Sequence, residues 1–133
     1  MYKCLVRPAA DYSACVYGPM LSDDQAKRIE KQQQQIMKVI FGFDKSYREI
    51  LEKYDIITLK QRREELLDSF ILKSLKNPRF RDKWFPLRER NSRNLRSENR
   101  FIEKYARTDR LRKSPLYTMR RRANEMHKAG LLE

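Results

Sequence analysis

Residues 22–42, SDDQAKRIEKQQQQIMKVIFG, constrain the fold most, because they combine a start signal, an apolar face and a stop signal for one helix. Ser22 is a favoured N-cap residue, and Asp23 and Asp24 place negative charge where the helix dipole is positive. Gly42 can adopt the backbone angles that end a helix. The stretch therefore predicts a helix about 30 Å long, the width of a small domain.

Four consecutive glutamines, Gln32 to Gln35, interrupt the apolar face of this helix. A buried amide costs free energy unless it is hydrogen-bonded. We therefore expect the helix to form, with its middle less buried than its two ends. The residues expected on its apolar face recur at helical spacing; they are Ala26, Ile29, Ile36, Met37, Val39 and Ile40.

Further helices are predicted on both sides of this one. Residues 1–17 are apolar enough for one helix or two short helical pieces, and capping boxes at Ser46 and Thr58 open a short helix and a longer one that ends near Asn77. Three or four amphipathic helices joined by short connectors form a small helical bundle. We predict an all-α fold with a thumb-like bundle over residues 1–77.

The character of the chain changes at Pro78. Aromatic residues are interspersed with cations after this point, and residues 88–100 carry so few apolar side chains that an exposed loop is expected. Residues 101–106 could form a short helix, and Ser114-Pro115 opens a final one before Gly130. Residues 78–133 are thus predicted to be a basic, partly irregular extension with a C-terminal helix.

Positive charge is concentrated in this second half. The 133 residues carry a net charge of +13, with 12 Lys and Arg against 11 Asp and Glu in residues 1–72, but 19 against 7 in residues 73–133. Such asymmetry favours a polyanionic partner, most often nucleic acid, whose phosphates Arg can grip and whose bases aromatic rings can stack on.

Nothing in the pattern supports base-specific readout. The candidate nucleic-acid-binding residues are Arg79, Arg81, Lys83, Trp84, Arg88, Arg90, Arg93, Arg96, Arg100, Tyr105, Arg107, Arg110, Arg112, Lys113, Tyr117, Arg120, Arg121 and Arg122.

No catalytic, metal or cofactor site is predicted. The run Leu21-Ser22-Asp23-Asp24 is close to the apolar-x-Asp-Asp signature of polymerases, but a helix starts there and no strand precedes it, so the two aspartates fit helix capping better than two-metal chemistry. A single histidine, His127, does not build a metal site. We expect a protein that is not an enzyme and that holds neither metal nor cofactor.

An intracellular, non-membrane protein is expected. Cys4 and Cys15 do not make a disulfide framework, and we interpret them as two small buried thiols in a reducing compartment. No apolar run approaches the length of a membrane span, and the first residues do not open a signal peptide.

The order of short motifs resembles the C-terminal region, beyond the polymerase palm, of LINE-type (non-LTR) retrotransposon reverse transcriptases. The resemblance covers nearly the whole chain. The matching pieces are Arg7-Pro8 with Asp11-Tyr12, Val16-Tyr17-Gly18-Pro19, Ile29-Glu30 with Gln33, Ile40-Phe41-Gly42, Tyr47 with Leu51, Leu59 with Arg62-Arg63, Asn77-Pro78-Arg79-Phe80, Trp84-Phe85-Pro86, Leu95-Arg96, Ala106-Arg107-Thr108, Ser114-Pro115, and Met119-Arg120-Arg121 with Asn124.

This resemblance implies a thumb-like helical region and a basic extension that help to hold template RNA and target or product DNA. The palm, with its metal-binding aspartates, is not in this sequence, so the resemblance implies a non-catalytic fragment. Its implied partners are RNA or DNA, bound without sequence specificity, and the palm domain of a full-length parent. The chain departs from the family at Gln32, where an apolar residue is usual.

An alternative function remains open from the sequence. The chain could be a helical protein-interaction module whose basic tail docks an acidic protein, with Gln32 to Gln35 as a polar interface. Capture of acidic proteins from a nuclease-treated lysate, without retained nucleic acid, would favour this alternative.

Overall fold

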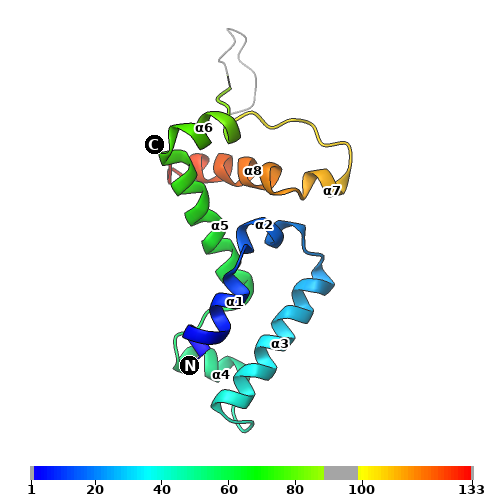
Figure 1. Ribbon diagram of the computed structural model, residues 1–133, viewed down its shortest axis with the longest axis vertical. Coiled ribbons are helices and arrows are strands. Elements are labelled where there is room, and N and C mark those ends of the chain that lie inside the picture. Colours follow the sequence, from blue (N-terminus) through cyan, green and yellow to red (C-terminus); the bar gives the residue numbers. More distant parts are fainter. Residues whose placement is uncertain (1, 89–98, 133) are drawn as a thin grey trace. The chain divides into compact units, whose positions relative to one another are not determined.

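The computed structural model describes residues 2–88 and 99–132 (Figure 1). Over these ranges the secondary structure is helical, apart from one antiparallel bridge between Leu87 and Phe101. The predicted all-α fold is confirmed. The chain divides into two compact units, Met1–Leu66 and Leu67–Glu133. The boundary expected between Asn77 and Pro78 stays a prediction.

Short helical pieces open the first unit. Its left-handed Ser13, with φ of 52°, separates two of them, so residues 1–17 form pieces rather than one helix. The elements are a π-helical turn at Tyr2–Val6, α1 (Arg7–Asp11), α2 (Ala14–Tyr17), a 3₁₀ turn at Gly18–Met20, α3 (Asp23–Phe41), α4 (Tyr47–Lys53) and the first part of α5 (Leu59–Lys76).

The ends of α3 match the sequence signals. The Ser22 N–H donates to Gln25 Oε1 at 3.0 Å, and the Gln25 N–H donates to Ser22 Oγ at 3.3 Å, which makes a capping box. At the other end Gly42 has φ of 102°, a conformation that favours glycine. The prediction of a helix over 22–42 is therefore confirmed.

The expected burial along α3 is wrong. Met37 (0% exposed) and Gln33 (3%) are its buried residues, while Val39 is 70% exposed and Ile36 is 37% exposed. Met37 clusters with residues from neighbouring elements, so these elements decide which side of the helix is covered. The members of the cluster are Tyr2, Met37, Ile50 and Ile56, with Ile40, Phe41 and Tyr54 among those packed against it.

Only one of the four glutamines is fully buried. Gln32 and Gln35 are exposed and Gln34 is partly so, whereas both polar atoms of the Gln33 amide are buried without a protein hydrogen-bond partner. The helix therefore forms with one fully buried glutamine, at the cost of desolvating that amide.

Replacing Gln33 with methionine should stabilise the protein. Methionine has a similar length and volume but removes the desolvated amide, so we expect the free energy of unfolding to rise by about 1–2 kcal/mol. Urea denaturation followed by circular dichroism measures this change. The matched control is Gln32→Met at the exposed neighbouring position, expected to stay within about 0.5 kcal/mol. A loss of stability in Gln33→Met would contradict the burial described here.

Side-chain hydrogen bonds join elements of the first unit. The Tyr47 hydroxyl donates to Glu30 Oε1 at 2.6 Å, which links α4 to α3, and Arg62 Nε donates to Asp11 Oδ2 at 3.1 Å, which links α5 to α1. Burial, reinforced by the hydrogen bond to Glu30, raises the pKa of Tyr47 well above its ordinary value. The phenol therefore stays protonated, and remains a donor, throughout the range in which proteins are usually studied.

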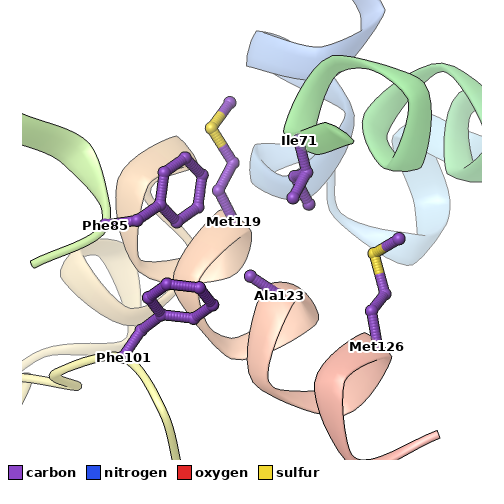
Figure 2. Packing of buried hydrophobic residues seen from close by; sticks show 6 residues of the cluster. All are labelled: Ile71, Phe85, Phe101, Met119, Ala123 and Met126. Atoms are coloured by element: carbon purple, nitrogen blue, oxygen red, sulfur yellow. The ribbon is translucent and has the colours of Figure 1, made fainter. Parts of the chain in front are cut away.

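The second unit has its own core, shown in Figure 2. The last part of α5 is joined there by α6 (Pro78–Trp84), α7 (Asp109–Arg112) and α8 (Pro115–Lys128). Aromatic rings meet edge to face in this core, because the Phe85 and Phe101 centroids lie 5.6 Å apart at 64°. The buried members are Ile71, Phe85, Phe101, Met119, Ala123 and Met126.

Residues 101–106 are not helical, contrary to expectation. Phe101 is buried in the core, and its neighbourhood pairs with the chain before the undescribed stretch: the Arg88 N–H donates to the Arg100 carbonyl at 2.9 Å, and the Ile102 N–H donates to the Pro86 carbonyl at 3.0 Å. These bonds satisfy the backbone outside a helix. The loop expected over 88–100 lies mostly outside the described residues.

The final helix follows its prediction, but neither α6 nor α7 was predicted. Met119, Ala123 and Met126 form the buried face of α8, whereas Leu116 is 41% exposed. Helix α7 is a single turn capped by Thr108, whose Oγ1 accepts from the Leu111 N–H at 3.2 Å.

Candidate nucleic-acid interface

The interface begins with a buried amide on α8. Asn124 is 2% exposed, and its side chain pairs with both backbone groups of Phe101. The Phe101 N–H donates to Asn124 Oδ1 at 2.9 Å, while Asn124 Nδ2 donates to the Phe101 carbonyl at 3.2 Å and to Glu103 Oε1 at 2.6 Å. One side chain thus fixes the start of the non-helical segment against α8, and the segment then leads to α7 (Figure 1).

We call the hydrogen bonds of Asn124 to Phe101 and Glu103 the clamp. Beyond it lies an open hollow of about 780 Å³, which we call the α7–α8 groove. Among its described lining residues, five are cations and two are acids, so the lining is net positive. Two tyrosines contribute aromatic surface. The lining residues are Glu103, Lys104, Tyr105, Ala106, Arg107, Thr108, Asp109, Arg112, Tyr117, Arg120 and Arg121.

The cations of the groove differ in how they are held. Arg107 and Arg121 are exposed, whereas Arg112 forms an ion pair with Asp109 one turn away. Arg120 Nε donates to the Trp84 carbonyl in the last turn of α6 at 2.7 Å. That bond positions the guanidinium at the groove wall and uses one of its five N–H donors, so the others can reach a phosphate.

Arg122 has a different role from its two neighbours. Its Nε and one terminal nitrogen each donate to a carboxylate oxygen of Asp68 at 2.8 Å, and it also pairs with Glu125 at 3.4 Å. The hydrogen bond to Asp68 raises the pKa of Arg122 above its ordinary value, outweighing the opposing effect of burial. This guanidinium links α8 to α5 and is committed to the fold.

The structure gathers some of the predicted nucleic-acid-binding residues and separates others. Those that line the groove are Tyr105, Arg107, Arg112, Tyr117, Arg120 and Arg121. Exposed but not among its lining residues are Arg79, Arg81, Lys83, Arg88, Arg110 and Lys113. The Arg100 guanidinium lies 5.9 Å from the centroid of the Phe101 ring. Arg90, Arg93 and Arg96 lie outside the described residues.

Trp84 belongs to an aromatic stack. Its ring centroid lies 4.6 Å from that of Phe80 and 6.0 Å from that of Phe70, with interplanar angles of 30° and 27°. Neighbouring rings therefore already occupy stacking positions on this indole, and Trp84 contributes to packing around the core of the second unit.

Sequence reasoning missed Lys104, Glu103 and Thr108 as groove residues. The helix expected over 101–106 would have pointed Glu103 and Lys104 to different sides of its axis, so these two residues were not expected to line a common groove. The sequence signal that could have indicated the true arrangement is Thr108-Asp109, a cap and first-turn acid that place a helix start after this segment.

Among residues 2–88 and 99–132, no group of three or more potential ligands could hold a metal ion, and no helix has the length and apolarity needed to cross a membrane. The expectation of two buried thiols is wrong, since Cys4 is exposed and Cys15 is half-buried; neither forms a disulfide.

Comparison with protein-family models, curated proteins and solved structures gave no significant match.

Proposed function

We propose that this protein binds the backbone of RNA or DNA through the α7–α8 groove, without sequence specificity and without catalysis of its own. The observation that carries the proposal is the convergence of cations from the 103–109 segment, α7 and α8 on one hollow that two tyrosines also line. Guanidinium groups grip phosphate oxygens, and aromatic rings accept any base by stacking. Origin as a post-palm fragment of a retrotransposon reverse transcriptase, implied by the sequence resemblance, is part of this proposal.

A concave site favours nucleic acid over the alternative of an acidic protein partner. Flexible strands can lay phosphates and bases into a hollow of this size, whereas docking of a protein generally relies on a broad surface. In addition, the polar interface considered for the alternative is incomplete, because Gln33 is 3% exposed and cannot present its amide to a partner.

Binding should weaken steeply as salt increases. If the five cations of the groove each neutralise one phosphate of a single strand, affinity should fall about 100-fold between roughly 50 and 200 mM NaCl, because bound phosphates release their counterions. Fluorescence anisotropy of a labelled 20-nucleotide strand measures this fall, and strands of unrelated sequence should give the same result.

Two outcomes of that titration would reject the proposal. One is an affinity that does not change across this salt range. The other is failure to bind any oligonucleotide while poly-glutamate is retained at low salt, which would support the acidic protein partner instead.

A further inference from the structure

We infer that the α7–α8 groove takes an unpaired strand in preference to a duplex, with the ring of Tyr105 as the platform on which a base stacks. This inference rests on the proposed function and specifies its ligand. Tyr105 is 87% exposed, lines the groove, and lies within two residues of the cations Lys104 and Arg107.

The size of the groove limits what can enter it. Sites of about 300–1,000 Å³ enclose ligands of drug size, so a hollow of about 780 Å³ suits one or two bases of a strand whose phosphates run past the cations of its lining. A duplex keeps its bases stacked inside the helix. It would have to unstack and expel one base before that base could enter the groove, which costs free energy. Only an unpaired strand can offer base and phosphate together without that cost.

The acidic residues of the groove do not oppose such a strand strongly. Glu103 accepts hydrogen bonds from Asn124 Nδ2 at 2.6 Å and from Asn99 Nδ2 at 3.2 Å, and Asp109 is paired with Arg112. Both carboxylates therefore already face donors of the protein, while Arg107 and Arg121 remain exposed to a ligand.

Tyrosine is suited to the stacking role because its ring is rigid and its edge tolerates water. Tyr117 also lines the groove but is half-buried on α8, so it offers less free surface than Tyr105. The exposed ring beside exposed cations thus resembles, on a small scale, the combination by which single-strand-binding proteins hold their ligand.

The test compares one labelled 12-nucleotide DNA strand with its blunt duplex at equal, low salt. We expect the strand to bind at least about tenfold more tightly, and Tyr105→Ala to weaken strand binding about tenfold while duplex binding changes less than about twofold. Tyr105→Phe should retain the strand affinity. Tyr12→Ala, at a tyrosine of the first unit that is 80% exposed, is the matched control and should leave both affinities unchanged.

The possible results distinguish failure of this inference from failure of the proposed function. Equal or tighter binding of the duplex, or an equal loss for both ligands in Tyr105→Ala, would overturn the inference and leave nucleic-acid binding in place. Failure of the wild-type protein to bind either ligand would overturn both.

Discussion

Replacing Asn124 with alanine is expected to lower the free energy of unfolding by about 2–4 kcal/mol, because it leaves the buried N–H and carbonyl of Phe101 without their partner. The same change should weaken nucleic-acid binding at temperatures where the variant is still folded. Without Asn124, the segment that carries Lys104, Tyr105 and Arg107 loses its hydrogen bonds to α8 and keeps only the packing of Phe101 in the core. Chemical denaturation and anisotropy, performed on the same preparation, measure the two effects.

Asn99→Ala is the matched control for this experiment. Asn99 Nδ2 also donates to Glu103 Oε1, at 3.2 Å, but this contact is exposed, so its loss should cost less than about 0.5 kcal/mol. If Asn124→Ala were no more destabilising than Asn99→Ala, the clamp would not hold the segment as described.

The double variant Arg107→Ala/Arg121→Ala is expected to weaken oligonucleotide binding about 10- to 100-fold at low salt. Both residues are exposed and line the groove, so the substitutions remove two phosphate contacts without disturbing the core. The loss should be the same for strands of different sequence, because backbone contacts carry no sequence information. Anisotropy titrations with two unrelated strands measure it.

Two control variants distinguish the effect of charge in the groove on affinity from the effect of the protein's total charge. Arg28→Ala/Lys38→Ala removes two exposed cations from α3 and should change affinity by less than about threefold. Arg122→Ala removes a cation next to Arg121, but one that Asp68 holds; it should cost about 1 kcal/mol of stability and leave affinity nearly unchanged. A loss in Arg28→Ala/Lys38→Ala equal to that of the groove variant would mean that binding follows net charge alone.

The sequence predicted helix starts well because capping is local. Ser46 donates its N–H to Glu49 at 3.2 Å, and Thr58 and Gln61 bond reciprocally at 3.3 and 3.2 Å, as the two capping boxes predicted. Each of these contacts joins residues three apart, so no knowledge of the remainder of the fold is needed to expect it.

The sequence did not predict which side of α3 would be buried. Ile36 and Val39 suit a core better than Gln33 does, yet Gln33 is covered and they are exposed. Coverage depends on where Tyr2 and Ile50 pack, and these residues come from other elements. Helical periodicity identifies a helix, but its covered face is decided by tertiary packing.

The candidate site shows the same limit. Composition predicted a basic, aromatic second half, but it did not distinguish Arg121 from Arg122, which are adjacent in the chain and have different roles. The difference is made by Asp68, 54 residues away, whose carboxylate binds Arg122. Likewise, composition suggested that Trp84 stacks on bases, whereas in the structure its ring stacks on Phe70 and Phe80.

The salt dependence of binding, compared between the wild-type protein and Arg107→Ala/Arg121→Ala, tests the central claim most directly. A plot of log affinity against log salt for one labelled strand should have a slope of about −3.5 for the wild type and about −2 for the variant, because two phosphate contacts are lost. Equal slopes for the two proteins would contradict the claim that the α7–α8 groove is where the nucleic-acid backbone binds.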